Sequence, residues 1–427
     1  MRTLTLLVAL GLTLAVAAPA PEEAPAAFDD ATNGVVDQAT HVADRETFDT
    51  TETIADGLGP VYNAQACREC HQNPASGGGS QVTELRVGHR DAKGNFVNPS
   101  IPIANGTAVV TGRTLVNDRA ICPNATSPDQ EIQERVPDTE NIRTLRVSLS
   151  LLGDGFVEAV PDETLKAIAE RQARETHGRI RGLAISVPVL EAPGQYRVGR
   201  FGWKDQHASL LSFAADAYLN EMGITSRLLP AEIVTLCDTV KDPEDAPGAN
   251  GLSDIDLFAR FIRASKAPPR YAALAATPDA VKGSALFDAI GCNSCHVRTL
   301  QTAPAGTQVN GGAFNVPPAL GDKVFHPYSD FLLHDVGTGD GIVIAVPEHF
   351  GMRYMAMQPT FNPTADRLRT APLWGLRTRS RLMHDAMSVT FADAIARHRG
   401  EAQRERKKFL RLSQKEKDQL YAFLRSL

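Results

Sequence analysis

The stretch Asp56–Gly79, D-G-L-G-P-V-Y-N-A-Q-A-C-R-E-C-H-Q-N-P-A-S-G-G-G, contains two cysteines that are separated by two residues and followed at once by a histidine. Cys67, Cys70 and His71 thus form the attachment pattern of a c-type haem. In this pattern the two thiols add to the vinyl groups of the porphyrin, and the histidine ligates the iron from one face. The glycines at 77–79 then allow the backbone to approach the porphyrin closely.

A second copy of the pattern stands at Cys292, Cys295 and His296. Two C-x-x-C pairs can instead form a tetrahedral zinc site, and a single pair can be redox-active. Neither alternative requires a histidine directly after both pairs. The sequence therefore predicts two covalently bound c-type haems, with His71 and His296 as the proximal iron ligands.

Length and composition are those of an ordinary globular protein. The 427 residues suffice for two or three domains, and 43% of them are hydrophobic and 22% charged. The formal net charge of −6 is mild. Neither nucleic acid nor an acidic membrane surface is therefore the expected partner.

The amino terminus has the pattern of an export signal. One basic residue precedes an apolar run from Leu4 to Ala18, and small residues follow. This pattern predicts a signal peptide over residues 1–18. The run is shorter than the roughly 20 residues of a membrane span, so no stable membrane insertion is expected. Because c-type haem is attached outside the bacterial cytoplasm, the predicted location is the periplasm.

The two haem patterns predict a mainly α fold with two cytochrome c-like helical domains, each around one haem, and short strands inserted in the first. Pro268-Pro269 marks the boundary between them. The predicted divisions are a flexible leader at 19–40, a first domain at 41–265, a linker at 266–275 and a second domain at 276–427.

Local patterning predicts the main elements. Period-two alternation indicates short strands at 84–87, 108–111, 144–149 and 182–189. Helical spacing indicates helices at 208–222, 253–264 and 281–290, and a capping box at 413–416 opens a carboxyl-terminal helix.

Several further stretches carry a resemblance to the bacterial di-haem oxidoreductase family, whose members are often described as thiol oxidoreductases or peroxidases. The family is distantly related to the di-haem cytochrome c peroxidases and the methylamine-utilisation di-haem enzymes. Where that family has glycines in two of these stretches, this chain has Ala386 and Arg399. The stretches are Asp56–His71, Gly77-Gly78, Arg200–Thr225, Lys266–Arg270, Leu332–Gly337, Arg369–Gly375, His384-Asp385 and His398–Ala402.

The resemblance implies a peroxidase-like enzyme. It places peroxide reduction at the His71 haem and electron transfer at the His296 haem, and it implies a calcium ion between the domains. The expected donor is a small redox protein or a quinol-linked cytochrome, and the expected substrate is peroxide or oxygen. Two alternatives stay open, a non-catalytic di-haem electron carrier and an oxygenase-type di-haem enzyme. The thiol-oxidoreductase description finds little support, because four cysteines are used for haem.

The remaining ligands and catalytic groups are less closely defined by the sequence. A peroxidatic site needs an acid–base group above the iron, for which His41, Glu84 and His89 are candidates. Arg86 and Arg90 are candidates for stabilising negative charge. Candidate sixth ligands of the second iron are Met352, Tyr354, Met355, Met357, Met383, His334 and His384.

Two pairs of residues keep two interpretations each. Trp203 and Trp374 either relay electrons between the haems or pack in the core, and the core role is favoured. Cys122 and Cys237 either form a disulfide or remain buried thiols.

Overall fold

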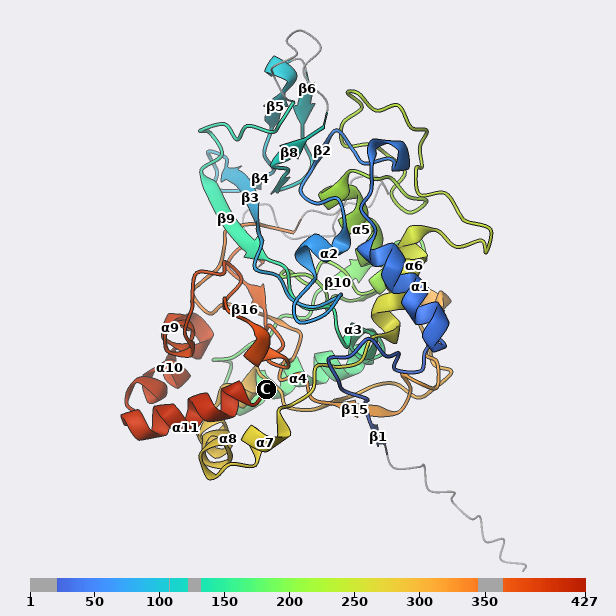
Figure 1. The fold of residues 1–427 in the computed structure, drawn as a ribbon. Coiled ribbons are helices and arrows are strands. Elements are labelled where there is room, and N and C mark those ends of the chain that lie inside the picture. The colour runs from blue at the N-terminus through green and yellow to red at the C-terminus, as the bar shows by residue number, and fades with distance from the viewer. Residues whose placement is uncertain (1–20, 107, 122–131, 345–363) are drawn as a thin grey trace, which may run out of the picture.

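The computed structural model describes residues 21–106, 108–121, 132–344 and 364–427. Helices predominate over strands, and the longest strands gather at one end of the molecule (Figure 1). The helices are α1 Gln38–Asp49, α2 Cys67–Cys70, α3 Asp154–Glu158, α4 Asp162–Glu175, α5 Leu210–Met222, α6 Asp254–Ala264, α7 Ala272–Ala275, α8 Pro278–Ile290, α9 Phe391–Arg397, α10 Gln403–Leu410 and α11 Gln414–Arg425. None of these helices is long and apolar enough to cross a membrane.

The strands are short, and most form two-stranded pairs. They are β1 Glu22–Glu23, β2 Val61–Tyr62, β3 Thr83–Arg90, β4 Phe96–Val97, β5 Ile101–Ile103, β6 Ala108–Val110, β7 Leu115–Val116, β8 Arg119–Ala120, β9 Ile142–Val147, β10 Ser186–Pro188, β11 Tyr196–Val198, β12 Leu300–Gln301, β13 Gln308–Val309, β14 Phe314–Asn315, β15 Lys323–Phe325, β16 Leu333–His334 and β17 Leu368–Arg369.

Strand β3 is the centre of the largest sheet. It pairs antiparallel with β4, β7 and β9, and its register places Glu84 opposite Arg146. Since side chains alternate along a strand, Glu84 and Arg86 lie on the same face of the sheet as Arg146. This charged face is directed toward the first functional site.

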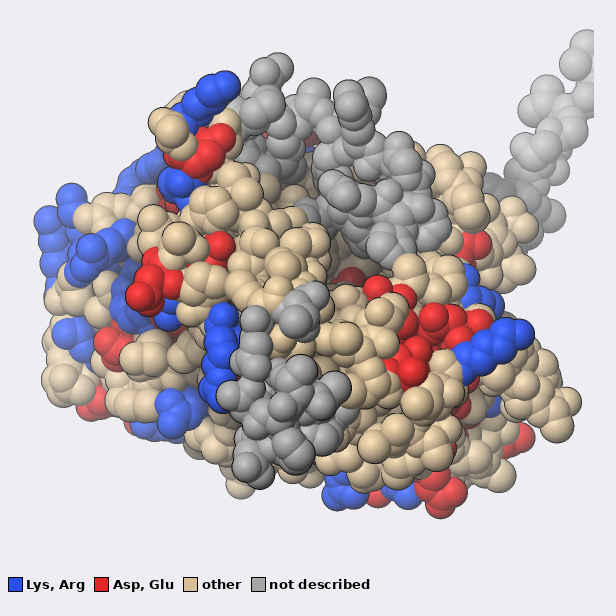
Figure 2. All heavy atoms as spheres, turned by 90° about the horizontal axis from the view of Figure 1, so that it is seen from above, with Lys and Arg blue, Asp and Glu red and all other residues tan. Residues whose placement is uncertain are grey.

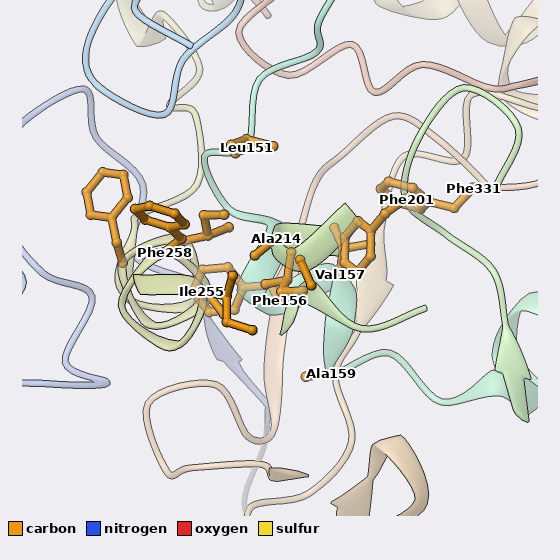
Figure 3. Close-up of a cluster of buried hydrophobic side chains, with 14 of the residues drawn as sticks. Leu151, Phe156, Val157, Ala159, Phe201, Ala214, Ile255, Phe258 and Phe331 are labelled. Atoms are coloured by element: carbon orange, nitrogen blue, oxygen red, sulfur yellow. The ribbon is translucent and has the colours of Figure 1, made fainter. Parts of the chain in front are cut away.

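The main hydrophobic core lies around α3, α5 and α6. Phe156, Phe201 and Phe258 are almost fully buried there, and Figure 3 shows Ile255 and Ala214 packed among them. The same cluster includes Leu300, Phe325 and Trp374, which come from the second predicted domain. The two predicted domains therefore share one core across the 266–275 linker.

A second core fixes the carboxyl-terminal helices. Helix α8 packs against α11 through Phe287, Leu420 and Phe423. The predicted capping box is present, because the Ser413 side chain accepts from the Glu416 amide and Glu416 reaches back to Ser413. Helix α11 therefore starts where the sequence indicates.

The leader predicted to be flexible is in part a structural element. Glu22 and Glu23 form β1, which pairs in parallel with β15, and Ala24 is buried in the main core. The Ala27 amide donates to the Ala267 carbonyl oxygen at 3.0 Å. The composition of this segment, rich in Ala, Pro and acidic residues, indicated flexibility. The structure shows instead that β15, far along the chain, supplies hydrogen-bond partners for the backbone of β1.

Candidate functional site

His71 stands at the edge of a cavity of about 470 Å³. Its Nδ1 lies 3.3 Å from the Gly78 carbonyl oxygen, so an Nδ1–H donor leaves Nε2 free for a metal. At Gly78 a Cβ would lie 2.2 Å from the Asn73 carbonyl oxygen, and only glycine fits. Cys67 and Cys70, on α2, are free thiols.

His296 stands at a second cavity, of about 230 Å³, lined also by Cys292 and Cys295. Its Nδ1 lies 3.0 Å from the Tyr328 carbonyl oxygen, the same arrangement as at His71. The wall is mostly apolar and includes side chains from α8, α9 and α11. Burial lowers the pKa of both histidines to about 4, so both imidazoles are neutral, as iron ligation requires.

Both cavities fit a covalently bound haem. At the second cavity the free thiols of Cys292 and Cys295 line the wall with His296, whereas at the first the free thiols of Cys67 and Cys70 stand on α2 directly before His71. In each histidine it is Nδ1 that a backbone carbonyl oxygen holds, which leaves Nε2 for the iron.

One nearby guanidinium group also lacks the carboxylate partner that the acidic side chains of a porphyrin would supply. Among the described residues no carboxylate accepts a hydrogen bond from Arg379, whereas Nε of Arg369 pairs with Asp205 at 3.7 Å. Burial, together with neighbouring Arg369, lowers the pKa of Arg379 to about 10.

Polar and charged side chains from the sheet and α5 line the His71 cavity. Arg86 donates to Oε1 of Glu84 from Nε at 3.0 Å and from Nη2 at 2.9 Å. Glu221, at the end of α5, hydrogen-bonds to Glu84 and accepts from Nδ2 of Asn63 at 2.9 Å. Glu84 and Glu221 therefore form a hydrogen-bonded carboxyl pair in the cavity.

This carboxyl pair holds one proton. Burial and the charge of Glu84 raise the pKa of Glu221 well above its ordinary value. Burial also disfavours charge on Glu84, but Arg86 and the hydrogen bond from Glu221 outweigh it and lower the pKa of Glu84. Of the two, Glu84 is therefore the carboxylate and Glu221 its proton-bearing neighbour. Nothing in the sequence around Glu221 indicated this role, because the pairing depends on the tertiary fold.

Of the three predicted acid–base residues, only Glu84 lines this cavity. His41 is buried on α1 and stacks on Phe261 with ring centroids 5.3 Å apart. His89, on β3, pairs with Glu140 at 2.8 Å. His41 and His89 are therefore placed by core packing and by sheet structure, respectively. Of the two predicted arginines, Arg86 lines the cavity.

Three of the predicted sixth ligands lie at the His296 cavity: Met383, His384 and His334. His334 has both ring nitrogens engaged, Nε2 with Asp330 and Nδ1 with Glu401, each at 2.8 Å. Burial lowers its pKa, but Cys295, Asp330 and the hydrogen bonds to them outweigh burial and raise it well above its ordinary value. His334 thus has both ring nitrogens paired with carboxylates and none free for iron.

His384 and Met383 remain available. His384 is buried, its Nδ1 has no hydrogen-bond partner, and burial lowers its pKa to about 4. Met383 and Ala386 have φ values of 67° and 57°, so Ala386 adopts the left-handed conformation that a glycine would adopt without strain. Met352, Tyr354, Met355 and Met357 lie outside the described residues, and their role stays a prediction.

His398 also lines the His296 cavity, although the sequence did not single it out as a ligand. Its Nδ1 lies 2.8 Å from the Ala394 carbonyl oxygen. His71, His296 and His398 thus share one arrangement, with Nδ1 held by a backbone carbonyl. The stretch His398–Ala402 was among those that carry the family resemblance. It lies far along the chain from Cys292–His296, however, so the sequence alone did not indicate that His398 reaches this cavity.

Trp203 lines both cavities, together with Ser148–Ser150 and Arg369. Its Nε1 donates to the Val147 carbonyl oxygen at 2.8 Å, and its ring is 6.0 Å from that of His384. Trp374 instead packs against Phe325 in the main core. The favoured core role therefore describes Trp374, whereas Trp203 has the position of a bridge between the cavities.

Residues 116–427 match the family described as "Di-haem oxidoreductase, putative peroxidase". This chain belongs to that family. The match includes the second haem pattern and begins after the first. Membership makes the chain a di-haem, peroxidase-like oxidoreductase, as the resemblance implied. The chain matches no curated protein sequence.

Solved structures similar to this di-haem oxidoreductase include hydrazine synthase of Kuenenia stuttgartiensis, at 12% identity and a TM-score of 0.37, with all of both chains covered. A MauG-like protein associated with microbial copper homeostasis has 14% identity and a TM-score of 0.39, with 98% of this chain and 95% of that chain covered. The diheme peroxidase BthA from Burkholderia thailandensis E264 has 15% identity and a TM-score of 0.26, covering 52% and 59%.

The predicted calcium ion stays a prediction. Glu232, Asp238, Asp242 and Glu244 approach one another in the loop after α5, beside the His71 cavity rather than at the second one. Only Asp242 among these four residues is exposed, and the acidic group is not by itself a cation site. Cys237 is disulfide-bonded, and Cys122 lies outside the described residues.

Proposed function

We propose that this di-haem oxidoreductase reduces hydrogen peroxide at the His71 cavity, with electrons supplied through the His296 cavity. The observation that carries the proposal is the Glu84–Glu221 carboxyl pair beside His71. Reduction of one peroxide consumes two electrons and two protons and gives two waters. Haem iron with an open sixth position supplies the site at which the O–O bond is cleaved.

The residues around His71 supply the proton chemistry. The Glu84 carboxylate accepts the proton of the peroxide oxygen nearer the iron and returns it to the oxygen that leaves as water. Arg86 keeps Glu84 ionised and orients it through two hydrogen bonds. Glu221 holds a second proton in hydrogen-bond contact with Glu84. The neighbouring cations Arg146 and Lys204 favour negative charge in the cavity.

The residues around His296 fit electron transfer. His296 and one of Met383, His384 and His398 would hold the second iron from its two faces, because all four line one apolar cavity. His398 is favoured among them by the backbone carbonyl that holds its Nδ1. Trp203 then separates this cavity from the peroxide site, in a position for electrons to pass between them.

Attachment through the two C-x-x-C-H patterns and export to the periplasm belong to the same proposal. The free thiols at Cys67, Cys70, Cys292 and Cys295 support attachment, and the apolar run from Leu4 to Ala18 supports export.

Glu84→Gln tests the acid–base role. We expect its rate of peroxide consumption, with a small-molecule reductant, to fall by about 10²- to 10⁴-fold, with both haems retained. His89→Gln, on the same strand but outside the cavity, is the matched control and should keep the wild-type rate. Equal rates for Glu84→Gln and wild type would remove Glu84 from the mechanism.

Glu221→Gln sharpens the test through its pH profile. Because the pKa of Glu221 is raised, the wild-type pair keeps its shared proton to a higher pH than an ordinary carboxyl group would, and activity should fall as the pH rises through that pKa. The glutamine keeps a neutral side chain at every pH, so this fall should disappear. An unchanged fall in Glu221→Gln would contradict the shared proton.

A further inference from the structure

Positive charge is concentrated at the carboxyl-terminal end of the chain. Residues 376–427 hold 13 of the 44 Lys and Arg residues but 6 of the 50 Asp and Glu residues, a net charge of +7 in a chain of net charge −6. Figure 2 shows Lys and Arg gathered at the end of the molecule where Figure 1 places α9, α10 and α11. The remainder of the chain is acidic, so the molecule has a strong charge asymmetry.

Helix α10 presents its cations on one outward face. Arg404 and Lys407 on the helix and Arg411 at its C-cap are exposed and follow the three- and four-residue spacing of a helix face. Among the described residues none of the three makes an ion pair. The inward residues differ, because Glu405 pairs with Arg179 at 2.9 Å and Arg406 donates to the Ala396 carbonyl oxygen. The outward cations are thus available to a partner.

The same helix is a wall of the His296 cavity. Ala402, Glu405 and Arg406 line that cavity. Only the thickness of α10 itself therefore separates its outward face from the cavity. Leu410, 45% exposed, adds an apolar side chain among the cations. A redox protein seated on this face would lie close to the second haem.

We propose that the outward face of α10, formed by Arg404, Lys407, Leu410 and Arg411, is the docking surface for a small acidic redox protein that donates electrons to the His296 haem. The proposal deepens the proposed function and rests on it. Electron-transfer complexes are small and transient, and charge complementarity gives them fast association. The acidic remainder of the molecule repels an acidic donor and directs it to this end. Two reduced donors each lose one electron for every peroxide converted, with two protons, to two waters.

The test uses one donor fold in two charge states, mitochondrial cytochrome c with its native basic surface and the same protein succinylated to an acidic one. Stopped-flow spectroscopy without peroxide measures how fast each reduced form reduces the His296 haem. The succinylated form should react faster, and its rate should fall with added salt. The double variant K407E/R411E should lower that rate by about tenfold or more at low salt.

The control is K93E/K241E, which makes the same change in net charge at exposed positions far along the chain. It should leave the rate with succinylated cytochrome c unchanged. Faster reaction with the basic form, or equal losses in both double variants, would overturn the docking surface. Peroxide consumption with ascorbate should be the same in both variants. If the wild-type protein consumed no peroxide with ascorbate, the proposed function would be overturned, independently of the docking result.

Discussion

The two cavities begin from the same C-x-x-C-H pattern but differ in everything placed around it. The His71 cavity is lined by carboxylates and cations from β3, β9 and α5. The His296 cavity is smaller and mostly apolar, and its wall includes side chains of α8, α9 and α11. Under the proposed function, local sequence sets where a haem attaches, whereas distant elements set what that haem does. A polar cavity suits proton-coupled cleavage, and an apolar one suits electron transfer.

The largest expected effect comes from removing the cysteines of one haem pattern at a time. This change should separate peroxide binding from electron supply. C67S/C70S should lose one haem and all peroxide binding, because no iron then lies beside Glu84. C292S/C295S should also lose one haem but still bind peroxide, while its steady-state turnover stops for lack of electrons. Pyridine haemochrome spectra and intact mass count the haems, and rapid-mixing spectra detect peroxide binding. Peroxide binding lost only in C292S/C295S would reverse the assignment.

Asp340 supports the cationic wall of the His71 cavity. Its Oδ2 accepts from Nη2 of Arg146 at 2.7 Å and its Oδ1 lies 2.8 Å from Nζ of Lys204. Asp340→Asn leaves two buried cations without their carboxylate and should lower the free energy of unfolding by about 3–5 kcal/mol. Denaturant unfolding measures the change, with exposed Asp118→Asn as a control. Equal stability of the two variants would contradict the supporting role.

The contacts of Asp340 with these two cations also make the stability of the fold depend on pH. Burial disfavours charge on Asp340, but Arg146 and Lys204 outweigh it and lower its pKa to about 2, from 3.8. A carboxyl group whose pKa is lowered on folding stabilises the folded state at pH values above its ordinary pKa. This contribution is lost as the pH falls from about 4 toward 2. Wild type should therefore lose stability in that window, and Asp340→Asn should lose less.

A smaller effect is expected at the boundary between the cavities. Trp203→Phe should slow electron transfer from the His296 haem to the His71 haem, because the indole that lines both cavities is replaced by a smaller ring. Trp374→Phe, in the main core, should leave this rate unchanged. This rate is measured by reducing the His296 haem in a flash or stopped-flow experiment and following the absorbance of the His71 haem. Equal rates in the two variants would leave Trp203 as a packing residue.

The sequence predicted the local parts of this arrangement well. The strand at β3, the helix ending at Gly223 and the capping box of α11 depend on neighbouring residues, and a short window contains each of them. Glu221 and His398 could not be predicted, because each meets its cavity only through the tertiary fold. His41 was an unsuccessful candidate for the same reason, since proximity in sequence to Cys67 does not imply exposure to the cavity.

The most direct measurement is the electron paramagnetic resonance spectrum of the holoprotein, as isolated and half-reduced. One high-spin and one low-spin signal are expected as isolated. After half-reduction the high-spin signal of the His71 iron should remain and shift with cyanide, and His398→Ala should alter only the low-spin signal. Two low-spin signals that persist on half-reduction and resist cyanide would contradict a peroxide site and leave an electron carrier.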